Sequence, residues 1–319
     1  MAENPRLDVD IVIPVFNEAG LIERIHGHLC DVLGSIPHNF RIIYVDDGSS
    51  DGTADTLRRI ADADRRISLL QLSRNFGHQA ALTAGMDAAT GDVIITMDGD
   101  GQHPPEMILQ MLNLIQQGYD IVQTQRIDEG GAATFKKVTS NLFYRLINII
   151  SGTQVLQGAA DFRALSRDAL NGLKSMHEYH RFLRGMISWM GYASVILPYH
   201  EPERLAGQSK YSLGKMMRLA SDAVFSFSLA PLYIGLSSGL AFLVLAVAQM
   251  LWVAYLWLTG QTGRIVAGWS SLMAISLIAS GIIMILLGFI GVYVGYIFQE
   301  VKRRPIYLVK GGKNKDGEQ

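Results

Sequence analysis

Apolar and polar residues follow two different periods in the first 130 residues of the chain. Segments 18–36, 52–64 and 104–118 repeat apolar residues at helical spacing. Short apolar runs that predict strands flank these segments: DIVIPVF (10–16), FRIIYVD (40–46), ISLLQLS (67–73), DVIITMD (92–98) and YDIVQTQ (119–125). Strands that alternate with helices predict βαβ units, and therefore an α/β fold with a mainly parallel sheet.

The pattern changes after residue 225. Segments 229–258 and 269–298 are almost free of charge, and each exceeds the roughly 20 residues that cross about 30 Å of hydrocarbon. Basic residues precede the first segment and follow the second, while Arg264 is the one basic residue between them. The positive-inside rule then predicts a membrane hairpin with both ends in the cytoplasm. A pair of buried helices in a large soluble core is the alternative.

These patterns predict three parts: a cytoplasmic domain (1–225), two transmembrane helices (226–300) and a basic cytoplasmic tail (301–319). The N-terminus carries acids where a signal peptide would be basic, so its apolar run reads as a first strand. We expect an integral protein of a bacterial inner membrane, and the glycines of the two apolar segments suit oligomerisation between helices.

Composition narrows the function classes. The formal net charge is −1 and the pI is about 6.7, which leaves no electrostatic footprint for nucleic acid. Cys30 is the single cysteine, so an internal disulfide and a cysteine-based zinc cage are both excluded.

Polar residues follow the ends of the predicted strands. Their carboxyl ends share one edge of a parallel sheet, where ligands bind in such folds. Asp98 and Asp100 are the strongest candidates there, because residues two apart in an extended segment face the same side. Two carboxylates suit Mg²⁺ or Mn²⁺ bridging phosphate groups. A solvated turn rich in aspartate is the alternative, since Asp-x-Asp alone is a common tripeptide.

Six motifs occur together in one order: IPVFNE, VDDGSSDGT, SRNFGHQAALTAG, MDGDGQHPPE, DFRALSR and RLAGQSKYS. In this combination the chain resembles family 2 glycosyltransferases that act on polyprenyl phosphates, such as bactoprenol glucosyltransferases and dolichol-phosphate mannose synthase. The resemblance covers nearly the whole chain. It implies a GT-A fold, a nucleotide-sugar donor and an inverting transfer to a lipid phosphate.

The resemblance also implies roles for individual residues. Asp98 and Asp100 would contact ribose, metal and diphosphate. His103 would support the sugar site, or alternatively cap the helix that Pro104 and Pro105 open. The implied nucleotide-sugar site consists of Pro14, Asn17, Glu18, Asp46, Asp47, Asp98, Gln102 and His103.

A lipid phosphate is already an anion, so the transfer needs positioning and charge neutralisation more than a strong base. Arginine suits that task through bidentate hydrogen bonds. The resemblance places the segment of Asp161, Arg163 and Arg167 by the donor sugar and acceptor phosphate, where Asp161 would hold sugar hydroxyls. Arg181 and Arg184 are weaker candidates for phosphate contact. The expected catalytic set is Asp100, Asp161, Arg163, Arg126, Arg204 and Lys210.

The chain departs from the family pattern at a few positions. Gly158 and Ala160 replace an aspartate and a glycine, which leaves Asp161 as the acid of that segment. His78 stands where relatives often have lysine. Segments 135–152 and 209–227 mix apolar and basic residues, and this pattern predicts amphipathic helices at a membrane surface, or otherwise helices on the sheet.

We therefore expect a metal-dependent transfer of glucose from UDP-glucose to undecaprenyl phosphate. Alternatives are mannose from GDP-mannose, an aminoarabinose transfer, and a non-catalytic protein that binds nucleotide sugar or lipid phosphate. A processive polysaccharide synthase is disfavoured, because the chain has no Gln-x-x-Arg-Trp motif.

Overall fold

The computed structural model describes residues 6–127, 159–200, 230–260 and 268–311. They fall into an α/β unit and a separate helical unit. The predicted amphipathic segments 135–152 and 209–227 lie outside the described residues, as do Arg204 and Lys210.

The α/β unit is built on a seven-stranded sheet in the order β3-β2-β1-β4-β6-β5-β7. Every neighbouring pair is parallel except those made by β6, which runs antiparallel to β4 and β5. The prediction of an α/β fold with a mainly parallel sheet is confirmed. The strands are β1 (Asp8–Val15), β2 (Asn39–Asp46), β3 (Ile67–Gln71), β4 (Val93–Thr96), β5 (Ile121–Arg126), β6 (Ala159–Ser166) and β7 (Ser194–Tyr199).

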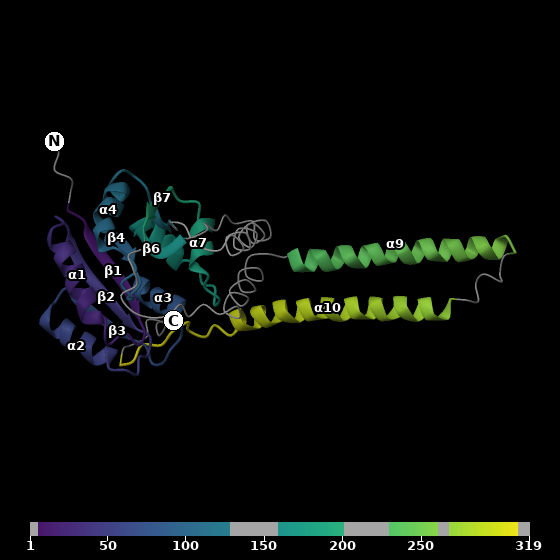
Figure 1. The fold of residues 1–319 in the computed structure, drawn as a ribbon, viewed down its shortest axis with the longest axis horizontal. Helices are drawn as coiled ribbons and strands as arrows, with labels where there is room; N and C mark the ends of the chain where they lie inside the picture. Colours follow the sequence, from purple (N-terminus) through teal and green to yellow (C-terminus); the bar gives the residue numbers. More distant parts are fainter. Residues whose placement is uncertain (1–5, 128–158, 201–229, 261–267, 312–319) are drawn as a thin grey trace. The chain divides into compact units, whose positions relative to one another are not determined.

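Helices lie between most of these strands along the chain (Figure 1). In α1, the buried residues Ile22, Ile25, Leu29 and Leu33 recur at the spacing of a single helical face. The central strand β1 is buried along nearly its whole length. The helices are α1 (Ile22–Gly34), α2 (Thr53–Ala63), α3 (His78–Ala88), the short η1 (Pro105–Met107), α4 (Ile108–Gln116), α6 (Arg167–Lys174) and α7 (Leu183–Trp189).

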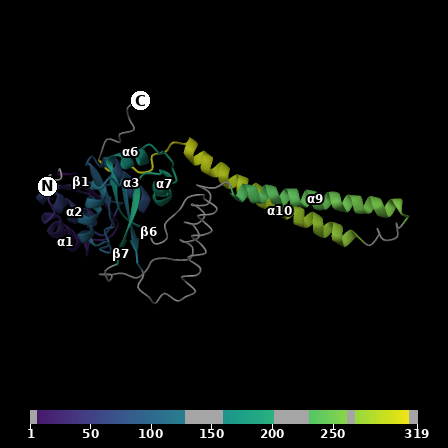
Figure 2. The same ribbon diagram turned by 90° about the horizontal axis from the view of Figure 1, so that it is seen from above.

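The second unit consists of α9 (Ala230–Leu258) and α10 (Trp269–Val301), which run side by side in Figures 1 and 2. Each contains a 24-residue stretch long and apolar enough to cross a membrane, with mean hydropathies of 2.1 and 2.3. These stretches are almost entirely unburied, at 6% and 0%, unlike the core helices of a soluble protein. Gly235 allows close packing within the chain, since a Cβ there would lie 1.8 Å from Leu286 Cδ2.

The described end of the chain returns to the α/β unit. After α10, Leu308 and Lys310 exchange backbone hydrogen bonds with the end of β3, and Val309 forms an antiparallel bridge with Leu72. Residues 306–310, here named the C-terminal strap, therefore extend the sheet at its β3 edge.

Candidate active site

The loops after β1 and β2 are held together by reciprocal hydrogen bonds. The backbone N–H of Asn17 donates to Ser49 Oγ over 2.9 Å, and Asn17 Oδ1 accepts from Ser50 N over 2.9 Å. Asn17 adopts a left-handed conformation with φ 56°, which asparagine tolerates better than most residues. Glu18 N donates to Thr53 Oγ1, which completes the connection. Asn17 thus shapes the loop through its own side chain.

The adjacent acids at the end of β2 have different surroundings. Asp47 accepts hydrogen bonds from Phe76 N (2.7 Å) and Gly77 N (2.9 Å), so it fixes the loop that enters α3. Burial raises the pKa of Asp47, and those two backbone donors oppose the rise. Asp46 is fully buried, and its Oδ2 has no hydrogen-bond partner among the described residues. Asp46 Oδ2 is therefore an acceptor that a bound ligand could use.

The loop after β4 carries Asp98 and Asp100 around a glycine that cannot be replaced freely. A Cβ on Gly99 would lie 2.6 Å from Val15 Cγ1 and 3.1 Å from Pro14 O. A hydrogen bond to a buried histidine also fixes the loop, because Asp98 N donates to His103 Nδ1 over 2.9 Å. Asp100 Oδ1 accepts from the backbone N–H of Gln102. These contacts keep both carboxylates at the carboxyl edge of the sheet.

The reversed strand β6 brings Asp161 to the same edge. Thr96 on β4 is paired with Arg163 on β6. In an antiparallel pair, a step forward along one strand matches a step backward along the other. Asp98, two residues after Thr96, therefore lies opposite Asp161, two residues before Arg163. Thr96 Oγ1 donates to the Asp161 backbone carbonyl over 2.7 Å and secures this register. A parallel β6 would have placed Asp161 at the far edge.

Asp161 lies at the centre of a buried ionic cluster. Arg184, on α7, makes two hydrogen bonds to its carboxylate, at 3.2 Å and 3.0 Å. Arg163 also donates to it, and His78 Nε2 lies 3.4 Å from both Asp161 Oδ2 and Asp98 Oδ1. Burial alone would raise the pKa of Asp161, but Arg184, Arg163 and His78 hold it well below its usual range. Asp161 is therefore a carboxylate.

The same cluster contains an arginine hydrogen-bond donor without a partner in the part of the chain that the structure describes. The side chains of Arg163 and Asp161 are only 4% and 6% exposed, and Asp161 is the one carboxylate that accepts hydrogen bonds from both guanidinium groups. Arg163 Nη1 is buried and has no hydrogen-bond partner among the described residues. Burial of an unpaired charged donor is costly. The cluster therefore suits a bound anion.

His78 lies between the carboxylates of Asp98 and Asp161. Partial burial would lower its pKa, but hydrogen bonding to Asp161 and the charges of Asp98 and Asp161 raise it.

Comparison with known proteins decides the family. The family model described as glycosyl transferase family 2 matches residues 10–173. The chain belongs to this family. It is 38% identical to the uncharacterized glycosyltransferase YkcC of Bacillus subtilis, over 95% of this chain and 94% of that one. It is 33% identical to the bactoprenol glucosyl transferase of Shigella phage SfV, over 97% and 100% of the two chains.

Solved structures are more distant. Mannosyl-3-phosphoglycerate synthase from Rubrobacter xylanophilus has a TM-score of 0.49 at 20% identity, covering 68% of this chain and 72% of the other. The family match, together with the sheet topology, identifies the α/β unit as the GT-A domain of a family 2 glycosyl transferase.

In this glycosyl transferase most of the predicted site residues lie at the carboxyl edge of the parallel strands. Their surroundings differ from one residue to the next. His103 is 5% exposed and stacks on Phe162, with ring centroids 5.1 Å apart. It supports the Asp98 loop from the core. Arg126 is exposed at the end of β5. Pro14 is buried within β1.

Two arginines singled out in the sequence, Arg167 and Arg181, lie outside the ionic cluster. Arg167 donates to the backbone carbonyls of Ala89 and Gly91, and Arg181 donates to Met176 O. These contacts stabilise turns of the domain. Arg184, in contrast, belongs to the centre of the site, and the sequence offered only its proximity to Arg181 as a signal.

The donor set fits a divalent cation that also binds substrate oxygens. Among the described residues, no group of three or more His, Cys, Asp or Glu side chains is arranged to hold a metal alone. Asp98 Oδ1 is buried without a hydrogen bond, although His78 lies nearby. Mg²⁺ commonly uses one or two carboxylates with phosphates and water. Asp98 and Asp100 match that pattern.

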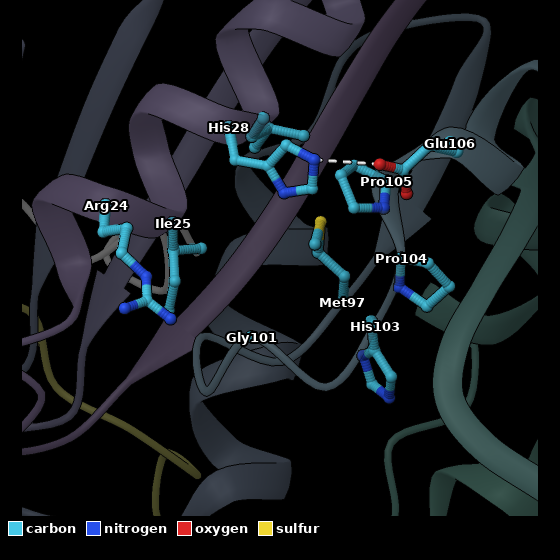
Figure 3. A pocket seen from close by; sticks show the side chains of 10 residues that line it. Arg24, Ile25, His28, Met97, Gly101, His103, Pro104, Pro105 and Glu106 are labelled. Carbon is cyan, nitrogen blue, oxygen red and sulfur yellow. Dashed lines mark hydrogen bonds and ion pairs between the residues drawn. The ribbon is translucent and has the colours of Figure 1, made fainter. Parts of the chain in front are cut away.

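A cavity of about 420 Å³ lies between α1 and the loop that carries His103 (Figure 3). Ile25, Met97 and the two prolines give it an apolar lining, and His28 pairs with Glu106 over 2.8 Å at its rim. It is not lined by Asp161 or Arg163. The cavity is therefore distinct from the ionic cluster.

Proposed function

We propose that this family 2 glycosyl transferase moves a hexose from a nucleotide sugar to the phosphate of a polyprenyl phosphate. The observation that carries the proposal is the buried cluster of Asp161, Arg163 and Arg184, whose spare guanidinium donor suits a phosphate oxygen. A hydrogen bond from a charged arginine to a phosphate oxygen is stronger than one between neutral groups. The similarity to bactoprenol glucosyl transferases supports a lipid-linked acceptor.

The chemistry is a single displacement at the anomeric carbon. An oxygen of the acceptor phosphate forms the new bond to C1 as the bond from C1 to the donor diphosphate breaks. The nucleoside diphosphate leaves with the bonding electrons, and the configuration at C1 is inverted. The acceptor oxygen is already ionised, so no side chain needs to remove a proton. Arg163 and Arg184 orient the acceptor phosphate and offset its charge.

Asp98 and Asp100 would hold Mg²⁺ or Mn²⁺, which neutralises charge on the diphosphate leaving group when bound. The loops of Pro14–Glu18 and Asp46–Asp47 would hold the nucleotide. Asp46 Oδ2, buried without a hydrogen bond among the described residues, suits a donor on the base or ribose.

UDP-glucose is our first choice of donor and undecaprenyl phosphate our first choice of acceptor. GDP-mannose and an aminoarabinose donor are the alternatives within the same chemistry. We further propose that α9 and α10 cross a bacterial inner membrane, with the catalytic domain in the cytoplasm and a homo-oligomer formed through the helices. Lys302, Arg303 and Arg304 after α10 fit a cytoplasmic end.

The test is transfer of labelled sugar into an organic extract by the full chain in detergent. Each donor is offered with undecaprenyl phosphate and Mn²⁺, and a chelator is added in parallel. We expect label from one donor, lost with the chelator, with Asp98→Asn and with Arg163→Met. Asp62→Asn is the matched control, because Asp62 is exposed on α2. If nucleotide sugar binds and no donor labels lipid, the protein is a binding protein and the proposal fails.

A further inference from the structure

The C-terminal strap is joined to the end of β3 by backbone pairing. Ser73 N donates to Leu308 O over 2.8 Å, and Lys310 N donates to Gln71 O over 2.7 Å. Val309 and Leu72 form an antiparallel bridge between these bonds. Because β3 is otherwise the outer strand of the sheet, the strap occupies an edge that would offer unpaired backbone groups.

A side chain forms a second attachment. Tyr307 Oη donates to Asp87 Oδ2 over 3.0 Å, and Asp87 lies in the last turn of α3. The strap therefore contacts the strand that enters the loop 73–77 and the helix that leaves it (Figure 1). Both supports of this loop are held by one short segment of chain.

The loop 73–77 contacts Asp47 and Gly48, in the segment to which the proposed function assigns the nucleotide. Phe76 N and Gly77 N donate to Asp47. Gly48 packs so closely against the loop that a Cβ there would lie 2.5 Å from the carbonyl carbon of Arg74. His78, which follows the loop, reaches Asp98 and Asp161. A shift of the loop would therefore move contacts of three acidic site residues.

We propose that the strap positions the loop 73–77 for donor binding, with Tyr307 and the Lys310 N–H as its attachment points. The inference rests on the proposed function for the identity of the donor. Residues 302–305 connect the strap directly to α10, so the second candidate membrane span is linked through a few residues to the nucleotide side of the catalytic domain.

Lys310→Pro tests the backbone attachment, because proline removes the N–H donor. Val309 before it is paired in an extended bridge, the conformation that a following proline favours. Lys310→Ala is the matched control, since it keeps the N–H. Tyr307→Phe removes only the hydroxyl of the second attachment, and Tyr119→Phe, at a partly exposed tyrosine, is its control.

The full chain in detergent is assayed for donor KM, kcat and nucleoside diphosphate affinity. Loss of one hydrogen bond that orders the site should raise donor KM about 2- to 12-fold in Lys310→Pro, with kcat nearly unchanged. Tyr307→Phe should give a change in the same direction. Hydrogen exchange at the amides of Ser73, Phe76 and Gly77 should quicken in both variants and in neither control.

Equal donor KM and equal Ser73 exchange in Lys310→Pro and Lys310→Ala would overturn the proposal. A fall in kcat with unchanged donor KM and affinity would also overturn it, because that result indicates general damage. A wild-type protein that transfers no sugar refutes the proposed function instead. The exchange rates and the nucleoside diphosphate affinity still test the strap in that case.

Discussion

Replacement of Asp161 by asparagine should destabilise the catalytic domain by about 3–5 kcal/mol, the cost of breaking a buried ion pair from one side. We use the cost for buried ion pairs because the Asp161 side chain is 6% exposed and the Arg163 side chain is 4% exposed. Asparagine is neutral and replaces one acceptor oxygen with a donor NH2 group, whereas the carboxylate accepts from Arg163 and from both donors of Arg184.

The assay is thermal unfolding of the full chain in detergent, followed by a tryptophan signal and by loss of solubility. At about 2–4 °C per kcal/mol for a domain of this size, the melting temperature should fall by roughly 6–20 °C. Asp62→Asn, at an exposed aspartate on α2, is the control and should shift it by less than about 2 °C.

The double variant Asp161→Asn, Arg163→Met separates loss of the pair from exposure of an unpaired charge. Removing both charges should recover part of the loss, with a coupling of about 0.5–3 kcal/mol. The reasoning is refuted if Asp161→Asn melts with the control, or if the double variant loses the full sum of the two single changes.

Three further predictions concern the rest of the domain. Asp10→Asn should cost about 1.5–3 kcal/mol, since buried Asp10 accepts from Arg41 and from backbone N–H groups. Burial raises the pKa of Asp10, but these donors lower it overall, so its contribution is present above about pH 4 and lost at lower pH; melting temperatures of the variant and wild type should converge on acidification. Gly99→Ala should abolish transfer by displacing the Asp98 loop, whereas Gly27→Ala, where a Cβ meets nothing within 4 Å, should keep activity and gain about 0.5–1 kcal/mol. Glu106→Gln should change stability by less than about 1 kcal/mol in urea unfolding, because its pair with His28 is exposed.

The apolar pattern was sufficient to predict the first five strands, because each combines β-branched residues with a polar turn. It did not predict β6 or β7. β6 contains Asp161 and Arg163 in its interior, and a strand of eight residues with two buried charges is not predicted until their partners are known. β7 includes Pro198, which a strand tolerates at the edge of a sheet. Both strands depend on contacts far along the chain.

The same reason limits what the sequence reveals of the site. The strand ends predicted the meeting of Asp46, Asp47 and Asp98 at one edge. The pairing of Asp98 with Asp161 depends on the reversal of β6, which no local pattern encodes. Asp47 binds the loop before α3 and Asp46 does not, because the backbone N–H groups of that loop reach Asp47. Those positions are set by the tertiary structure.

The antiparallel pairing of β5 with β6 also affects how the connection between them can change in length. Gln125, near the end of β5, is paired with Ala159 at the start of β6, so the chain between them departs from and returns to almost one point. Doubling the length of a flexible connection between two fixed ends costs only about 0.6 kcal/mol. The number of residues between Gln125 and Ala159 can therefore change while the pairing of β5 with β6, and with it the position of Asp161, stays the same.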